Sequence, residues 1–321
     1  MTSTDRAVPK VHVGIVSWNT AAWLDRCLAS LPGALAGLDA EVVVVDNASD
    51  DDSAEVAGRH DGVRVLRNGE NTGYARAMNL ALRGATAPVL IALNPDAEPG
   101  PGSLAALVER LTRHPDVGLV SPRLCNLDGT PQHSAYRFPS LRLAAAVCLL
   151  PAALQRGRIG RRWLLEGAPE PTGAADVDWT TGAVHCMRAV ATGAQPYRER
   201  WFMYVEDLDL CFRLRQEGWR VVFDSDVTVG HAGNAAGSRA WGAGRDRRVL
   251  EASYDWYRLE RGPVSVRAWA GVNAIGIAGR LAATALTGAG AWPAAESRRS
   301  RARALAALLR LHVRAMALGR V

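Results

Sequence analysis

The first 125 residues alternate apolar, β-branched runs with stretches of helical spacing. The runs expected to form strands are Val11–Ser17, Glu41–Asp46, Val63–Leu66 and Pro88–Leu93. The run EVVVVD at 41–46 has no polar residue between its two acids, as expected for a strand buried on both faces of a parallel sheet. This rhythm predicts an α/β fold: an open, mostly parallel sheet flanked by helices.

Helical spacing follows the first three strand-like runs. The helices expected there are Ala21–Leu31, ended by Pro32-Gly33, then Asp51–Arg59 and Thr72–Arg83. Beyond about residue 125, Asn126–Asp178 is rich in loop-forming residues apart from an apolar stretch at 141–154. Order returns at Asp178–Met187 and Trp201–Gly218, and Arg220–Phe223 is predicted as a late strand. The glycine-rich segment 230–244 is predicted to be a mobile lid or a linker.

Two helical candidates, Val264–Trp292 and Glu296–Leu318, end the sequence. The first is long enough to span a bilayer, but Arg267 and Arg280 make spanning costly, so an interfacial or packed helix is favoured. The second is amphipathic and basic. The expected domains are residues 1–240, with a nucleotide half at about 11–124 and an acceptor half at about 125–240, and a helical, membrane-associating appendage at 241–321.

Charge is concentrated in this tail. The net charge is +6, and the chain from Val264 onward holds nine arginines and one acid, Glu296. The remainder is close to neutral, which argues against general nucleic-acid binding. The tail fits an anionic membrane surface, with a solvated helical face as the alternative. Since MTSTDRAVPK at 1–10 lacks an apolar signal core, and the five cysteines form no CxxC pair, we expect a cytoplasmic protein at the inner face of the membrane.

Polar clusters follow the predicted strands, where ligands bind in open α/β sheets. They contain Ser17 and Asn19, then Asp46, and finally Asn94-Pro95-Asp96. Asp46 is positioned to accept hydrogen bonds from a base or ribose, or simply to cap the next helix. Asp96 is a candidate ligand for a divalent cation that would bridge a diphosphate.

Three further segments carry candidate chemistry. Asn71, Gly73 and Arg76 open a helix whose N–H groups and positive charge suit a diphosphate, or form an ordinary glycine turn. His231 follows the late strand and is a second candidate metal ligand. Glu206 and Asp207 begin a helix, where acids are favoured by the helix dipole, or where one serves as a general base.

Together these segments resemble glycosyltransferase family 2 with the GT-A fold, most closely the bacterial rhamnosyl and galactofuranosyl transferases of cell-envelope polysaccharide. The similar pieces are VSWN at 16–19, VVDNASDD at 44–51, NTGYARAMN at 71–79, LNPD at 93–96, SPRL at 121–124, WTTGA at 179–183, FMYVEDLDLCFRLRQEGW at 202–219, and the segment 231–238. They occur in the family's order over roughly residues 11–240.

The resemblance implies roles for individual residues. Asp46 is similar to the nucleotide-binding acid, and Asp207 to the general base with Glu206 beside it. Asp96 is similar to the metal-binding acid, although Asn94-Pro95-Asp96 stands where many relatives have Asp-X-Asp, and His231 to a late metal ligand. The residues implied on the acceptor side are Trp179, Thr181 and Gly182. Independently of the resemblance, the aromatic residues Trp201, Phe202 and Tyr204 just before Glu206 are expected to wall a sugar pocket.

The resemblance implies an inverting transfer from a nucleotide diphosphate sugar, dependent on Mg²⁺ or Mn²⁺. The leading donor hypothesis is dTDP-rhamnose, with a lipid-linked or glycan acceptor; UDP-galactofuranose and UDP-N-acetylglucosamine are alternative donors, and a homo-oligomer is left open. One rival is a nucleotide-sugar pyrophosphorylase, but SWNTAAW stands where its basic glycine-rich loop would be, and the only lysine is Lys10. Another is a catalytically silent scaffold, but the joint presence of Asp46, Asp96, Asp207 and His231 argues against it.

Overall fold

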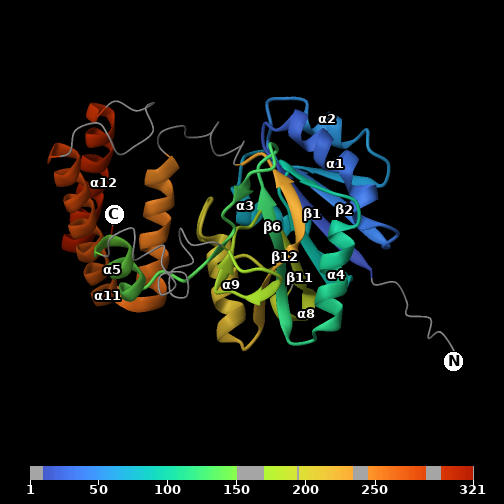
Figure 1. Ribbon diagram of the computed structural model, residues 1–321. Helices are drawn as coiled ribbons and strands as arrows, with labels where there is room; N and C mark the ends of the chain where they lie inside the picture. The colour runs from blue at the N-terminus through green and yellow to red at the C-terminus, as the bar shows by residue number, and fades with distance from the viewer. Residues whose placement is uncertain (1–9, 150–169, 194, 234–244, 287–297, 321) are drawn as a thin grey trace. The chain divides into compact units, whose positions relative to one another are not determined.

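The computed structural model describes residues 10–149, 170–193, 195–233, 245–286 and 298–320. These residues form two compact units (Figure 1). The first runs to Tyr136 and resumes from Glu170 to residue 233, and the second contains 137–149 and the described residues from 245 onward. The sequence prediction assigns 137–149 to the first domain, but this segment forms a helix that packs with the C-terminal helices.

The first unit is built on one mixed, mostly parallel sheet with the strand order β3-β2-β1-β4-β11-β6-β12-β5. Its main strands are β1 (Val11–Ser17), β2 (Ala40–Asp46), β3 (Val63–Arg67), β4 (Val89–Leu93), β5 (Ala97–Pro99), β6 (Val117–Cys125), β11 (Val184–Arg188) and β12 (Arg220–His231). Strand β11 is antiparallel to both neighbours, and β5 is antiparallel to β12. The predicted α/β class and mostly parallel sheet are confirmed.

Short strands extend this architecture. Strand β7 (Pro131–Gln132) pairs with β6, and β9 (Ala174–Asp176) pairs with β12. Strands β8 (Ala135–Tyr136) and β10 (Trp179–Thr180) form a separate two-stranded sheet. The predicted late strand Arg220–Phe223 continues to His231, because β12 resumes its pairing with β6 beyond an irregularity after Asp224.

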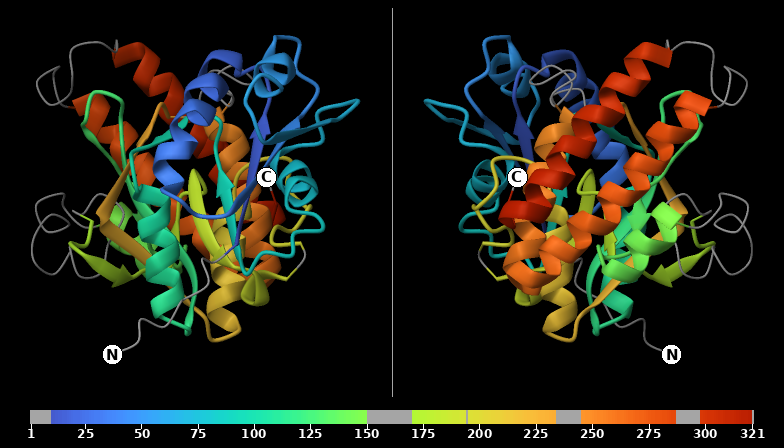
Figure 2. Two further views of the ribbon diagram at one scale, coloured as in Figure 1. Left: turned by 90° about the vertical axis from the view of Figure 1, so that its right-hand side faces the viewer. Right: turned by 90° about the vertical axis from the view of Figure 1, so that its left-hand side faces the viewer.

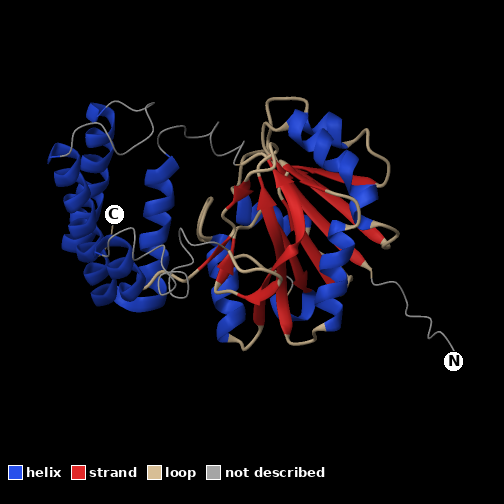
Figure 3. Ribbon diagram, viewed as in Figure 1, coloured by secondary structure: helices blue, strands red, loops and turns tan. Residues whose placement is uncertain are grey.

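Helices cover both faces of the sheet (Figure 3). They are α1 (Ala21–Leu35), α2 (Ser53–Ala57), α3 (Tyr74–Ala81), α4 (Ser103–Arg113), α8 (Ala189–Thr192) and α9 (Glu206–Gln216). Val13 and Ile15 share one core with residues of α1 and α4. On the opposite face α3 packs directly on β1, since a Cβ at Gly14 would lie 2.9 Å from Leu82 and 3.0 Å from Met78.

One predicted helix end is wrong. Helix α1 continues through Pro32 and Gly33 to Leu35. Proline removes one backbone hydrogen bond and normally disfavours the helix interior. Here Leu31, Ala34 and Leu35 are buried in the core, so tertiary packing outweighs the local preference.

The second unit is helical (Figure 2). It contains α5 (Leu141–Leu149), α11 (Arg245–Leu286), which breaks at Gly262 (φ 83°, ψ 167°), and α12 (Arg298–Leu318). Helices α5 and α12 both pack on α11, and the rings of Tyr257 and Trp269, which precede and follow the break in α11, stack on each other. None of the helices within the described ranges is both long and apolar enough to cross a bilayer. The predicted segments 287–292 and 234–244 lie outside the described residues.

Candidate active site

The carboxyl ends of β1, β2 and β4 lie at one edge of the sheet. The parallel register places Ser17 beside Asp46 and Ile15 beside Leu93. The turns that follow β1 and β2 are joined by Asn19, whose N–H donates to the Ser49 hydroxyl at 3.0 Å and whose side-chain oxygen accepts the Asp50 N–H at 2.7 Å. The polar clusters predicted at strand ends are therefore assembled into one surface.

Two of the predicted nucleotide-binding residues differ in what they offer a ligand. The Ser17 hydroxyl is fully buried and bonds to the Thr20 hydroxyl at 2.7 Å, so it supports the turn after β1. One carboxylate oxygen of Asp46 accepts the Ser49 N–H at 3.4 Å, while the other is buried and has no hydrogen-bond partner among the described residues. A buried acceptor without a partner is costly, so Asp46 is suited to accept from a bound molecule.

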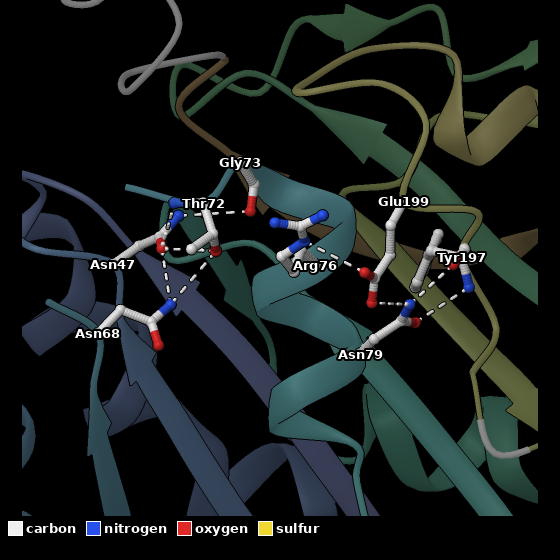
Figure 4. A network of polar contacts seen from close by, with 8 residues as sticks. All are labelled: Asn47, Asn68, Thr72, Gly73, Arg76, Asn79, Tyr197 and Glu199. Atoms are coloured by element: carbon white, nitrogen blue, oxygen red, sulfur yellow. Dashed lines mark hydrogen bonds and ion pairs between the residues drawn. The ribbon is translucent and has the colours of Figure 1, made fainter. Parts of the chain in front are cut away.

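Asn47 organises the loop before α3, a role that the sequence did not indicate (Figure 4). Its amide oxygen accepts from Asn68 at 2.9 Å and from the Thr72 N–H at 3.1 Å, and its amide nitrogen donates to Asn71 at 2.9 Å. The Asn71 oxygen also accepts the Gly73 N–H at 3.0 Å. The partners of Asn47 lie in the loop between β3 and α3, so only the folded sheet reveals this network.

The start of α3 is already hydrogen-bonded within the protein. The Tyr74 N–H donates to the Phe202 carbonyl at 2.8 Å, and the Thr72 and Gly73 N–H groups are used by the Asn47 network. Arg76 pairs with Glu199 at 3.1 Å (Figure 4). These groups hold the loop in place, so a diphosphate would have to displace existing bonds to use them.

Gly73→Ala is expected to destabilise the protein more than Gly62→Ala. Both glycines have positive φ, 83° and 75°, where alanine is strained. The ψ of 169° at Gly73 lies in a region almost confined to glycine, which adds to the strain there. A Cβ at Gly73 would also overlap the Phe202 carbonyl oxygen, whereas Gly62 faces open space. Thermal denaturation of the two variants should show the larger loss for Gly73→Ala by about 1–3 kcal/mol. Equal losses would contradict the close approach of the two backbones.

Asp96 and His231 meet although they lie far apart in sequence. Strand β5 pairs with the end of β12, which sets Ala97 opposite His231 and brings His231 Nε2 to 3.2 Å from an Asp96 carboxylate oxygen. Both side chains are buried. His231 Nδ1 lies 2.9 Å from the Gln132 oxygen, whose own amide nitrogen donates to the His231 carbonyl at 2.8 Å. Gln132 was not predicted, because its contact depends on β7 pairing with β6.

The Gln132 contact determines what His231 presents to Asp96. With the glutamine oxygen as acceptor, Nδ1 carries the proton, as in metal-binding histidines whose second nitrogen is hydrogen-bonded. Nε2 is then a buried nitrogen with no hydrogen-bond partner among the described residues, aimed at a carboxylate. This arrangement fits a cation between the two side chains. Within the described ranges, no three His, Cys, Asp or Glu side chains cluster as a self-sufficient metal site.

A chain of contacts connects this pair to the acids of α9. The Asn94 N–H, two residues before Asp96, donates to the Ala183 carbonyl at 2.9 Å. The neighbouring Gly182 N–H donates to an Asp207 carboxylate oxygen at 3.1 Å. The edge of the sheet that carries Asp96 therefore adjoins the turn that holds Asp207.

The three acids at the start of α9 have different environments. Asp209 is fully buried and paired with Arg198 at 3.0 Å and Arg213 at 2.9 Å, which makes it a structural residue. Burial raises the pKa of Asp207, while the N–H groups of Leu208 and Gly182 lower it. Burial, then the charge of Asp207, raises the pKa of Glu206 to about 8. At neutral pH the raised pKa favours the protonated form of Glu206. Glu206 is then suited to act as an acid or hydrogen-bond donor, and the neighbouring Asp207 to act as a base.

Glu206→Gln is expected to stabilise the protein increasingly as pH rises. In the unfolded chain Glu206 ionises near its ordinary pKa of 4.5, but in the folded protein only near 8. Between these values the unfolded state binds fewer protons, so this residue lowers stability as pH increases. Thermal midpoints of variant and wild type, compared at about pH 5 and about pH 9, should differ more at the higher pH. A difference independent of pH would contradict the raised pKa.

Of the predicted acceptor residues, Gly182 contacts Asp207 directly. Trp179 in β10 stacks on Tyr136 of β8, with ring centroids 4.4 Å apart and planes 17° from parallel. The Thr181 N–H donates to the Ser134 carbonyl at 3.0 Å, which ties this sheet to the Gly182 turn. Trp201 is buried with 7 % exposure, so it supports the site from within. Tyr136, which stacks on Trp179, is an aromatic residue that the sequence analysis did not single out.

Comparison with known proteins gives consistent matches. The family model for Glycosyl transferase family 2 matches residues 12–174. N-acetylglucosaminyl-diphospho-decaprenol L-rhamnosyltransferase of Mycobacterium tuberculosis is 32 % identical over 247 residues, covering 72 % of this chain and 76 % of that protein. Low-salt glycan biosynthesis hexosyltransferase Agl10 of Haloferax volcanii is 28 % identical over 185 residues, covering 56 % of this chain and 54 % of that protein.

Solved structures show the same fold. The mannosyltransferase from Pyrobaculum calidifontis, in complex with GDP-Man and Mn²⁺, superimposes with a TM-score of 0.58 and 19 % identity, covering 98 % of this chain and 89 % of that chain. GalNAc-T7 with UDP, GalNAc and Mn²⁺ superimposes with a TM-score of 0.53 and 17 % identity, covering 83 % of this chain and 53 % of that chain. The predicted GT-A architecture of the first unit is confirmed by these neighbours.

Proposed function

Because this chain belongs to glycosyl transferase family 2, we propose that it is an inverting enzyme that transfers a sugar from a nucleotide diphosphate donor to a hydroxyl of a lipid-linked acceptor in cell-envelope glycan synthesis. Three features at one edge of the sheet carry the proposal. Asp46 has one buried carboxylate oxygen with no hydrogen-bond partner among the described residues. Asp96 pairs with His231, and the partly buried carboxylate of Asp207 adjoins them through the Gly182 turn. The proposed donor is dTDP-rhamnose. The mycobacterial relative, named for L-rhamnosyl transfer to a decaprenol-linked sugar, supports this choice.

A divalent cation fits the residues at the sheet edge. Asp96 supplies an oxygen ligand and His231 an Nε2 with no hydrogen-bond partner in the described parts of the chain, held by Gln132. Mg²⁺ and Mn²⁺ are commonly held by one or two protein ligands with substrate phosphates completing their coordination. When bound, the cation would offset the negative charge of the departing diphosphate.

The protein's own side chains account for the remaining chemistry. Asp207 accepts the proton of the acceptor hydroxyl as that oxygen attacks the anomeric carbon on the face opposite the diphosphate. The N–H groups of Gly182 and Leu208 fix the two oxygens of Asp207, and the start of α9 favours its negative charge. Glu206, protonated near neutral pH, can donate a hydrogen bond to the acceptor beside it. Trp179 and Tyr136 offer an aromatic face to a sugar ring.

A panel of nucleotide sugars tests the donor. The chain is heated with each nucleotide sugar, with and without Mn²⁺, and transfer to a short-chain diphosphate-linked acceptor is followed with the same donors. A donor present at about 100 times its Kd should stabilise the fold by about 2.7 kcal/mol. Stabilisation and transfer with dTDP-rhamnose are expected. Transfer from another donor alone would refute the choice of sugar, and no transfer from any nucleotide sugar would refute the enzyme proposal.

The proposed acceptor sits in a membrane, and α12 offers a surface for one. Arg303, Arg310 and Arg314 are exposed at spacings of seven and four residues, which places them on one face of the helix. None pairs with a carboxylate of the described residues. Exposed Val313 lies beside them. Arginines interleaved with apolar side chains favour an anionic bilayer interface, and we propose that this face binds there.

Charge reversal tests this face. Arg303→Glu/Arg310→Glu/Arg314→Glu is expected to weaken binding to phosphatidylglycerol-containing vesicles by at least about 100-fold, since each arginine contributes about 1 kcal/mol. The matched control reverses three exposed arginines of the first unit, Arg59, Arg83 and Arg215. Flotation with and without phosphatidylglycerol gives the comparison. Equal losses in both triple variants, or equal binding to neutral vesicles, would contradict the assignment.

A further inference from the structure

Tyr74, the first residue of α3, contacts both segments that hold Asp207. Its N–H donates to the Phe202 carbonyl at 2.8 Å, where the turn into α9 begins. Its hydroxyl lies 3.5 Å from the Gly182 carbonyl oxygen. The N–H of the same glycine donates to Asp207 at 3.1 Å. One residue therefore ties the loop before α3 to the strand turn and to the helix that carries the proposed base.

The turn between Phe202 and α9 needs such support. Tyr204 and Val205 both have positive φ, 75° and 69°. Two consecutive residues other than glycine in this region are strained, and a β-branched side chain makes the conformation less favourable still. The turn is held at one end by the Tyr74 bond to Phe202 and at the other by the Asp209 N–H, which donates to the Val205 carbonyl at 2.8 Å. Strain of this kind persists only where its surroundings fix it.

The surroundings of the Tyr74 hydroxyl keep it a hydrogen-bond donor. Burial, then the nearby acids Glu206 and Asp207 and, more weakly, Asp96, raise the pKa of Tyr74 well above its ordinary value, and a hydrogen bond with Tyr197 lowers it only in part. Acids from the proposed base side and the proposed cation side thus both act on this phenol. Its ring packs edge-on against Tyr197, with centroids 5.8 Å apart, which fixes its direction.

The other side of Tyr74 leads to the nucleotide edge. Asn47, next to Asp46 at the end of β2, bonds to Asn71, to the Thr72 N–H and to the Gly73 carbonyl. The Gly73 backbone in turn approaches Phe202 so closely that no Cβ fits. A continuous set of contacts runs from Asp46 through this loop and Tyr74 to Asp207.

We propose that Tyr74 is a positioning residue that couples the loop at the nucleotide edge to Asp207, holding the base in register with a bound donor. The inference rests on the proposed function of Asp207. Tyr74 does not take part in proton transfer; its hydroxyl fixes the Gly182 turn and its N–H fixes the Phe202 turn. Loss of the hydroxyl therefore slows the transfer step and leaves donor binding unchanged.

Tyr74→Phe tests the inference, because it removes the hydroxyl and retains the ring and the backbone bond. We expect kcat to fall about 3- to 10-fold, the range of one net hydrogen bond. The donor KM should stay within about twofold, since the backbone loop is intact. The matched control is Tyr254→Phe, which deletes a buried hydroxyl 2.7 Å from His312 in the helical unit. It should lower the thermal midpoint at least as much as Tyr74→Phe while leaving kcat unchanged.

Gly182→Ala probes the same coupling from the other side. A Cβ there would lie 3.2 Å from the Asp207 Cβ, so Asp207 must shift by a few tenths of an ångström. We expect kcat to fall by at least about tenfold without loss of donor binding. The inference is overturned if Tyr74→Phe keeps the wild-type kcat. It is also overturned if the donor KM of Tyr74→Phe rises by as large a factor as its kcat falls. Asp207→Asn, assayed alongside, separates the two claims. If Asp207→Asn is inactive and Tyr74→Phe is fully active, only the proposed coupling is refuted. If Asp207→Asn is fully active, the proposed function of Asp207 is refuted.

Discussion

Asp207→Asn is expected to lower kcat for sugar transfer by about 10²- to 10⁴-fold, the usual contribution of a general base. The amide cannot accept the acceptor proton, but it keeps an oxygen for one of the N–H groups of Gly182 and Leu208 that now bind the carboxylate. Donor affinity should stay within about twofold, because Asp207 faces the acceptor in this account. Steady-state kinetics and nucleotide titration provide the two measurements.

Stability distinguishes lost chemistry from a damaged fold in this variant. Burial raises the pKa of Asp207, which means that the folded protein disfavours its charged form. A neutral amide removes this penalty, so the thermal midpoint of Asp207→Asn should not fall below that of the control Asp61→Asn, the same change at an exposed aspartate. A wild-type kcat in Asp207→Asn would show that Asp207 is not the general base.

Asp96→Asn is expected to have the second largest effect, a loss of at least about 100-fold in kcat/KM together with loss of cation-dependent donor binding. Asp96 is buried, and one of its carboxylate oxygens lies 3.2 Å from His231 Nε2. Without the carboxylate, one buried nitrogen remains as the protein's ligand, which is too weak a site for Mg²⁺. Calorimetric titration of the nucleotide diphosphate with and without Mn²⁺ measures the coupling directly.

A graded series strengthens the test of this pair. Gln132→Leu retains both ligands and removes only the oxygen that accepts from His231 Nδ1. Loss of such a supporting group typically costs 10- to 100-fold in metal affinity, so Gln132→Leu should fall between wild type and Asp96→Asn. His114→Ala, at an exposed histidine of the same unit, is the control. Nucleotide binding that is independent of Mn²⁺ in the wild type would contradict the cation site.

Residues at strand ends can be assigned from the sequence because hydrophobic periodicity marks the strands that precede them. EVVVVD has the pattern of a buried parallel strand, and parallel strands end at one edge, so the pattern alone predicts that Asp46 and Asp96 lie near each other. The pairing of Asp96 with His231 is different. It depends on the three-residue strand β5 lying antiparallel to β12, and a strand of that length leaves no usable pattern.

The groups that hold the site could not be predicted for the same reason. Asn47, Gln132 and Tyr74 act through contacts with segments between 21 and 108 residues away in the chain. Asparagine, glutamine and tyrosine are ordinary surface or core residues, and no periodicity marks them. The predicted end of α1 is wrong because Pro32 is a strong local signal, whereas the burial of Leu35 that overrides it is a tertiary property.

The role of α3 changes once its contacts are known. From sequence, its glycine start and Arg76 suit a phosphate. In the structure these groups bond to Phe202, Asn47 and Glu199, so the helix start supports the site. The proposed diphosphate site accordingly rests on Asp96 and His231, with Asp46 serving the nucleoside.

A crystal structure with dTDP and Mn²⁺ bound, using the anomalous signal of manganese, tests the central claim most directly. We expect one manganese peak within about 2.5 Å of an Asp96 oxygen, His231 Nε2 and the diphosphate. The nucleoside should lie against Asp46, and the Asp207 carboxylate should face the open side of the diphosphate. Manganese bound away from Asp96, or a nucleotide on a surface that Asp207 does not share, would contradict it.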